Sequence, residues 1–278
     1  MTEPLILQAR ARAGIDDVRQ ALTDPKALNL WLGEHSTVDL PTTFEFWGRY
    51  IPEGDAPHQR VLGYDGQTLK LAWTLDGEET TTEIALTAET DDSTLIKLTQ
   101  SHFDFAEAIS GASIRGVLQT FWSLALANLV DHLEGRELTT RPDFTSAEFA
   151  GDALIDAPVA QVYESLTTSE KASAWFGFPI GIEPHIGGRF AMGGFDAGPG
   201  ARVVEVVEGS KMSVDWGDAG ISTWELAESG GKTRLTFVMS GFDEDKPPYA
   251  AWLGWLSGVA ALRRFNEQKD WQSIWVVG

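Results

Sequence analysis

Apolar and polar residues alternate along much of this chain. In one stretch Leu69, Leu71 and Trp73 are the apolar members, and the same two-residue period continues at Ile84 and Leu86. Such alternation predicts antiparallel strands with one buried face. The predicted strands are residues 4–13, 36–40, 43–51, 59–63, 68–74, 80–88, 94–102, 148–155, 180–186, 189–192, 201–207, 211–216, 222–228 and 232–239. Two apolar stripes with helical spacing predict long helices at residues 112–134 and 249–269.

The order of these elements is written twice in the chain. Residues 14–33 and 155–177 each predict two short helices, and Trp31 and Gly33 of the first stretch correspond to Trp175 and Gly177 of the second. In each copy a strand precedes the short helices, and six strands and a long helix follow them. The pattern predicts two tandem α+β domains, residues 1–138 and 148–278, joined by a polar linker at 139–147.

Composition narrows the class of protein. The chain has 278 residues, 43% of them hydrophobic, which is enough for two domains with separate cores. It has no cysteine, so disulfides, thiol catalysis and cysteine-based zinc sites are excluded. The formal charge of −20 argues against nucleic acid and against anionic membrane surfaces as partners. Because the first residues carry no basic segment followed by an apolar run, and no apolar run would insert into a membrane, we expect a cytoplasmic protein.

Several short motifs of the second copy lie in a recognisable order. They are Ala157-Pro158, Ala174-Trp175-Phe176, Gly187-Gly188-Arg189-Phe190, the apolar run at 203–207, Trp216, Lys232-Thr-Arg-Leu-Thr and Trp255. Together they resemble the START/SRPBCC superfamily and, within it, the family of domains similar to the heat-shock-protein-90 ATPase activator. The first copy resembles the family more loosely, since it has Asp16-Asp17 in place of Ala-Pro and Trp47 in place of the first glycine.

This resemblance implies two helix-grip (Bet v 1/START-like) domains, in which a curved antiparallel sheet wraps a C-terminal helix. Superfamily members often hold small apolar molecules in a cavity between sheet and helix. The expected function is therefore non-enzymatic binding of a small apolar or amphipathic molecule, without a cofactor. One alternative is a stress-response protein that contacts a chaperone partner of the heat-shock ATPase type. A second alternative is a cyclase or hydrolase that uses the cavity. We also expect the two copies to contact each other.

The eleven tryptophans supply most of the candidate cavity residues. In the helix-grip arrangement Trp31, Trp73 and Trp122 are expected around the first cavity, and the second set is Trp175, Trp216, Trp224 and Trp255. Ligand pockets are commonly lined by aromatic side chains with a few polar groups. Aromatic residues also fill ordinary cores, so the same pattern allows two packed interiors.

The search for catalytic chemistry gives one polar candidate. His102 ends a strand that faces the long helix, where an imidazole can anchor a ligand or transfer a proton, or simply lie partly exposed at a strand end. The five histidines show no metal-ligand spacing, so no metal site is predicted. The glycine-rich loop at 193–200 lacks the lysine of a phosphate-binding loop, and we interpret it as a strand connection or a cavity lid.

Overall fold

A computed structural model describes residues 4–101 and 114–276 of the chain. The chain forms two compact units. The first unit comprises Met1–Ser146 and Ile274–Gly278, and the second comprises Ala147–Ser273. No helix among the described residues is both long and apolar enough to cross a bilayer.

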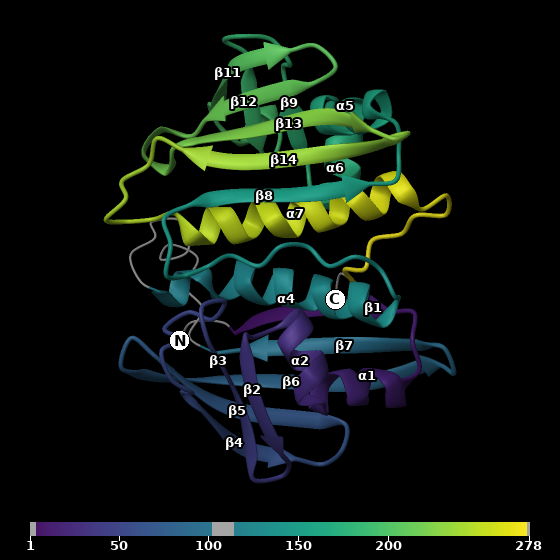
Figure 1. Cartoon of the computed structure of the whole chain (residues 1–278), viewed down its shortest axis with the longest axis vertical. Coiled ribbons are helices and arrows are strands. Elements are labelled where there is room, and N and C mark those ends of the chain that lie inside the picture. Colours follow the sequence, from purple (N-terminus) through teal and green to yellow (C-terminus); the bar gives the residue numbers. More distant parts are fainter. Residues whose placement is uncertain (1–3, 102–113, 277–278) are drawn as a thin grey trace. The chain divides into compact units, whose positions relative to one another are not determined.

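The first unit contains a five-stranded antiparallel sheet in the order β1-β7-β6-β5-β4 and a separate two-stranded sheet, β2-β3 (Figure 1). Its long helix, α4, follows the strands in the chain. The elements are β1 (Leu5–Ala11), α1 (Ile15–Thr23), α2 (Pro25–Trp31), β2 (His35–Asp39), β3 (Thr43–Trp47), β4 (Gln59–Tyr64), β5 (Thr68–Leu75), β6 (Glu78–Thr90), β7 (Ser93–Gln100), η1 (Ile114–Val117) and α4 (Leu118–Leu133).

The separation of β2-β3 from the main sheet differs from the continuous strand series that the alternation predicted. A side chain bridges the break, because the Gln59 amide oxygen accepts a hydrogen bond from the backbone N–H of Phe46 at 3.1 Å. The buried amide thereby satisfies a backbone donor that a neighbouring strand would otherwise pair.

The second unit has one seven-stranded antiparallel sheet in the order β8-β14-β13-β12-β11-β10-β9. Its long helix α7 lies along β8 (Figure 1). The elements are β8 (Phe149–Ile155), α5 (Val159–Thr167), α6 (Ser169–Phe176), β9 (Ile180–Ile182), β10 (Arg189–Met192), η2 (Phe195–Ala197), β11 (Ala201–Val207), β12 (Lys211–Asp215), η3 (Gly217–Ala219), β13 (Ile221–Ser229), β14 (Lys232–Ser240) and α7 (Tyr249–Glu267). The antiparallel sheets and closing helices confirm the predicted α+β helix-grip fold.

Equivalent hydrogen bonds recur in the two units. The indole N–H of Trp31 donates to the carbonyl of Ala21 at 3.0 Å, and the indole N–H of Trp175 donates to the carbonyl of Ser165 at 2.9 Å. Each bond joins the second short helix to the first across ten residues. In a second equivalent pair, a threonine hydroxyl of the sheet donates to a carbonyl two residues past the first strand of the unit: Thr94 to Ala13 at 2.8 Å, and Thr233 to Ala157 at 2.7 Å.

The last described residues of the chain belong to the first unit, although the sequence placed them in a domain spanning 148–278. The N–H of Arg10 donates to the carbonyl of Ile274 at 2.7 Å, and the N–H of Val276 donates to the carbonyl of Gln8 at 2.9 Å. These two bonds form an isolated antiparallel bridge, Ala9–Trp275, at the free edge of β1. Backbone groups at a sheet edge need partners, and the tail supplies them for part of β1.

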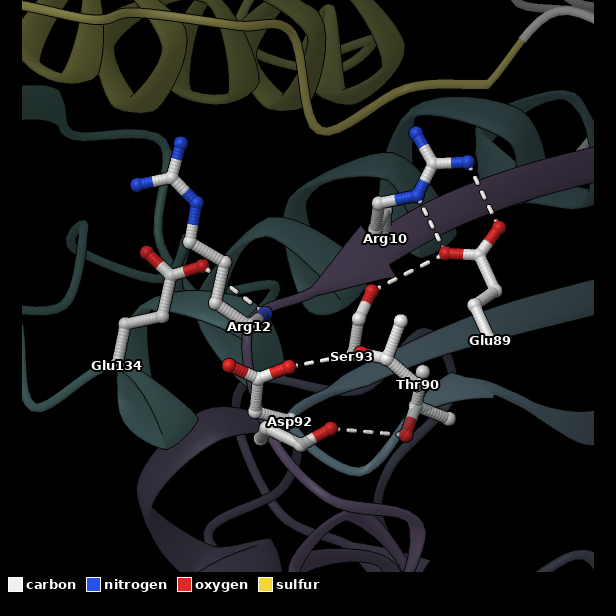
Figure 2. Close-up of polar contacts among 9 residues, drawn as sticks. Arg10, Arg12, Glu89, Thr90, Asp92, Ser93 and Glu134 are labelled. Atoms are coloured by element: carbon white, nitrogen blue, oxygen red, sulfur yellow. Dashed lines mark hydrogen bonds and ion pairs between the residues drawn. The ribbon is translucent and has the colours of Figure 1, made fainter.

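β1 also contributes a residue, Arg10, to a solvent-exposed ion pair. The Arg10 guanidinium donates two hydrogen bonds to the carboxylate of Glu89 on β6, at 2.5 and 2.7 Å, and Ser93 donates to the same carboxylate (Figure 2). The bond from Arg10 lowers the pKa of Glu89. The pair is solvent-exposed and therefore contributes little to stability at neutral pH.

The segment predicted as a linker, 139–147, is attached mainly to the first unit. Thr139 and Asn128 of α4 exchange two hydrogen bonds, at 2.9 and 3.0 Å. Further along, the guanidinium of Arg141 donates to the carbonyl of Gly33 at 2.7 Å and lies 4.1 Å from the ring centre of Tyr50. Burial lowers the pKa of Arg141.

Candidate functional site

Aromatic side chains fill much of the space between sheet and helix in the second unit. The centre of this cluster is Trp255 on α7, whose side chain is 8% exposed. Its ring centre lies 4.9–6.0 Å from those of five other aromatic residues: Phe176, Phe190, Trp216, Trp224 and Phe237. Four of the five come from strands or strand ends, where the two-residue period turns them toward the helix.

Trp175, the remaining tryptophan predicted for this interior, is buried on α6 and contacts Phe176. Its ring stacks on Phe176 with centres 4.1 Å apart, and its N–H is used by the bond to Ser165. Gly258 of α7 lets the helix approach, because a Cβ at this position would lie 3.3 Å from the Trp175 ring. The structure thus brings Trp216, Trp224 and Trp255 together and connects Trp175 to them through Phe176.

A pocket of about 520 Å³ opens beside this cluster. Phe190 and Met192 of β10, Ala201 of β11 and Trp216 provide its apolar wall. Phe190 pairs with Ala201 in the ladder, so both side chains project from the face of the sheet that meets α7. Polar and glycine residues complete the rim: Gly200, Arg202, Asp215 and Gly217.

The indole N–H of Trp216 is already bonded inside the unit. It donates to the hydroxyl of Ser222 on β13 at 2.6 Å. The ring of Trp216 therefore contributes an apolar surface to the pocket and no free donor.

The glycine-rich loop 193–200 borders this pocket. Gly200 is part of the rim, whereas Phe195 lies on the other face of the sheet. There it packs so closely on Gly181 that a Cβ would come within 2.7 Å of its ring. The guanidinium of Arg189 lies 4.5 Å from the ring centre of Phe195 and is paired with Glu183. The bond from Arg189 also lowers the pKa of Glu183.

A smaller pocket, of about 370 Å³, lies at the start of α5. Pro158, Val159 and Leu226 line it together with the charged residues Glu228 and Lys232. It is smaller than the pocket beside Trp216, and like that pocket it combines apolar and charged lining residues.

In the first unit the structure brings two of the predicted tryptophans together. The ring centres of Trp73 on β5 and Trp122 on α4 lie 5.9 Å apart, and Phe46 and Phe121 contact both rings. Trp31 packs separately, through its bond to Ala21. His102 lies outside the described residues.

Sequence reasoning missed a buried polar group in this interior, the side chain of Gln100. Its amide oxygen accepts from the Thr82 hydroxyl at 2.6 Å and from the Trp122 indole N–H at 3.1 Å. Its amide nitrogen donates to the carbonyl of Ser101 at 3.1 Å. The sequence does contain a sign of it: Gln100 follows Ile96 and Leu98 in the two-residue alternation of β7, so its amide lies on the same buried face.

Within the described ranges, no group of three or more histidine, aspartate or glutamate side chains is arranged to hold a metal ion. The pair formed by His58 and Asp55, 3.3 Å apart, is on the surface, and it lowers the pKa of Asp55.

Residues 156–264 match the sequence model of the family described as activator of Hsp90 ATPase homolog 1-like protein. The second unit belongs to this family. No curated protein matches the chain.

Solved structures with similar folds include three of note. CalU16 from Micromonospora echinospora is 24% identical over 48% of this chain and 76% of its own, with a TM-score of 0.37. DynU16, described as a protein in the dynemicin biosynthetic locus, is 15% identical over 96% of this chain and 98% of its own, with a TM-score of 0.40. The Aha1 dimer from Colwellia psychrerythraea is 17% identical over 44% of this chain and 98% of its own, with a TM-score of 0.39.

Proposed function

We propose that this protein is a non-enzymatic binding protein that holds a small apolar or amphipathic molecule in the pocket of its second unit. The observation that carries the proposal is the pocket of about 520 Å³ on the face of the sheet that meets α7. Pockets for small molecules commonly enclose roughly 300–1,000 Å³ and have mainly apolar walls with a few polar groups. The volume and the wall of Phe190, Met192, Ala201 and Trp216 both fit that description.

The distribution of polar groups supports an amphipathic molecule held by its apolar end. Its apolar end would contact Phe190 and Trp216, whose rings are fixed by their contacts with Trp255. Rings held in place before binding lose little conformational freedom when a ligand arrives. Arg202 and Asp215 at the rim leave the outer end of the ligand beside polar groups and solvent.

The proposal is tested by filling the pocket. N-phenyl-1-naphthylamine, a neutral apolar probe that fluoresces in apolar surroundings, is titrated into the wild-type protein and into Ala201→Phe. We expect the added ring to reduce probe affinity by about tenfold or more, since it occupies the volume that the probe requires. The matched control is Val207→Phe, which adds the same ring to the same strand at a position that is 48% exposed. Equal probe affinity in all three proteins would refute binding at this pocket.

A chaperone-linked role is the alternative that the family description favours, because the matching family takes its name from an activator of the Hsp90 ATPase. In that case the protein would act through its surface on a heat-shock ATPase. Stimulation of the ATPase rate by wild-type protein and by Ala201→Phe alike would support this role over ligand binding. A cyclase or hydrolase acting in the pocket is the remaining alternative, and it requires turnover of a bound compound.

A further inference from the structure

Two buried side-chain hydrogen-bond donors on the main sheet of the first unit have no acceptor among the described residues. They are the amide nitrogen Nε2 of Gln59 and the indole nitrogen Nε1 of Trp73. The two residues are 8% and 1% exposed. Most buried polar groups in folded proteins have a partner, and an unsatisfied buried donor is costly. Two such donors in one interior therefore require an explanation.

The two donors belong to neighbouring strands and face the same interior. Gln59 of β4 stands directly opposite Trp73 of β5 in the antiparallel ladder, so both side chains project from one face of the sheet. The Gln59 amide is also held in one orientation, because its oxygen accepts the N–H of Phe46 at 3.1 Å. Rotating the amide to hide its nitrogen would leave the Phe46 N–H without that acceptor.

The second unit shows how the equivalent tryptophan N–H is satisfied by the protein itself. There the N–H of Trp216 donates to Ser222, one strand away. The strand registers make Thr82 the counterpart of Ser222. Thr82 pairs with Leu71, two residues before Trp73. Ser222 pairs with Val214, two residues before Trp216.

Thr82 has a different partner in the first unit. Its hydroxyl donates to the amide oxygen of Gln100 at 2.6 Å. The same ladders make Met239 the counterpart of Gln100 in the second unit, where no amide competes for the hydroxyl. Gln100 thus engages the hydroxyl that corresponds to Ser222, and the N–H of Trp73 has no acceptor in the described part of the chain.

The missing partner is best supplied by an uncharged oxygen. A carbonyl oxygen has two lone pairs and can accept from both donors at once. A carboxylate would need a compensating cation, because burying an unpaired charge is very unfavourable. Yet every buried side chain of β4–β7 in the described chain is uncharged.

We propose that the first unit binds an apolar molecule through a neutral carbonyl-type oxygen, which accepts hydrogen bonds from Gln59 Nε2 and Trp73 Nε1. The inference deepens the proposed function, and rests on it, by giving the first unit a ligand class of its own. The rings of Phe46, Phe121 and Trp122 around Trp73 form the apolar surroundings of that oxygen.

The test uses the full chain with 15N-labelled tryptophan and three probes of similar shape. Acetophenone carries the neutral oxygen, α-methylstyrene replaces it with a methylene group, and benzoate carries a charge. The measured signal is the indole N–H resonance of Trp73 in a two-dimensional NMR titration, assigned by its loss in Trp73→Phe. We expect acetophenone to shift this resonance downfield and to bind about tenfold more tightly than α-methylstyrene, as a net gain of one to two neutral hydrogen bonds implies. Benzoate should bind more weakly than acetophenone.

Two variants separate the donor from the ring. Trp73→Phe keeps an aromatic ring and should reduce the preference for the ketone to less than about threefold. Trp31→Phe is the control, because its indole N–H is already bonded to Ala21 in the same unit, and the preference should remain. The wild-type shift itself requires no variant that could fail to fold.

The outcomes distinguish this inference from the proposed function. Ala201→Phe closes the pocket of the second unit and should leave the Trp73 shift unchanged. Absence of a Trp73 shift with acetophenone at millimolar concentration, or equal affinity for the ketone and the alkene, would overturn the inference and indicate that the donors bind water only. Neither result would affect probe binding at Ala201.

Discussion

The buried amide of Gln100 gives the sharpest quantitative prediction about the first unit. Replacing it with methionine reproduces the residue at the equivalent position of the second unit, Met239, and keeps the side-chain length. The change therefore removes hydrogen bonds without creating a large cavity. Gln100 is fully buried, and Trp122, which donates to its oxygen, is 1% exposed.

The expected cost follows from the groups left behind. The Trp122 indole N–H loses its acceptor at 3.1 Å, and a buried donor left unsatisfied costs about 1–3 kcal/mol. The Thr82 hydroxyl can rotate, and the methionine side chain gains from burial, so these contributions partly cancel. We expect Gln100→Met to destabilise the first unit by about 2 kcal/mol.

Hydrogen exchange measured by mass spectrometry reports the two units separately. Peptides from β6 and β7 should lose protection equivalent to about 2 kcal/mol, whereas peptides from β13 and β14 should remain unchanged. Gln67→Met is the matched control, since it makes the same substitution at an exposed position and should change stability by less than about 0.5 kcal/mol. A loss below about 0.5 kcal/mol for Gln100→Met would refute the view that its amide satisfies buried donors.

Three further predictions concern the edges and turns of the two units. Deleting Ile274–Gly278 should speed amide exchange at Arg10, whose N–H donates to Ile274, and unchanged protection there would contradict the pairing of the tail with β1. Because the pKa of Glu89 is lowered in the folded protein, its stabilising effect is present above the ordinary carboxyl pKa and is lost as the pH falls through the lowered value. Arg10→Ala removes the donor and should raise the pKa of Glu89 measured by NMR in the folded protein, and an unchanged pKa would count against the ion pair. Gly188→Ala should lower the urea midpoint of the second unit by the equivalent of about 3 kcal/mol, because its Cβ would lie 2.2 Å from the carbonyl oxygen of Glu183; an unchanged midpoint would show that the turn adjusts freely.

Much of the fold follows from the period of the apolar residues. Leu69, Leu71 and Trp73 are buried on β5 as the alternation predicted, and the stripe around Trp255 does form a long helix. The separation of β2-β3 was not predictable in this way, and neither was the bond by which the Gln59 side chain accepts the Phe46 N–H across the break. The period of the apolar residues shows which face of a strand is buried. It does not show where a side chain takes the place of a backbone hydrogen-bond partner.

The sequence predicted which tryptophans of the candidate site face the interior, but not all of their contacts. Strand phase and helix phase together brought Trp216, Trp224 and Trp255 into one cluster. Trp31 and Trp175 were grouped with their respective interiors, yet each indole is bonded to the preceding short helix, an arrangement that depends on how the two helices pack. Buried glutamines are harder to anticipate, because a polar residue at a strand end is also the usual start of a turn.

The attachment of the tail to β1 has a similar cause. The tail follows the second long helix in the sequence, so the prediction assigned it to the domain spanning 148–278. The choice depends on which sheet edge lacks a partner, and an edge is a property of the complete topology. Backbone bonds to Gln8 and Arg10 place the last described residues in the first unit.

Native mass spectrometry tests the central claim, binding of a small molecule in the second unit, most directly. Wild-type protein, Ala201→Phe and Val207→Phe are purified from the cells that make the protein, and any bound compound is identified after denaturation. The account predicts a stoichiometric apolar or amphipathic compound on the wild-type and Val207→Phe proteins and its loss from Ala201→Phe. Equal occupancy of all three proteins would contradict binding at the pocket of Phe190 and Trp216, and empty wild-type protein would shift the balance toward action through a protein partner.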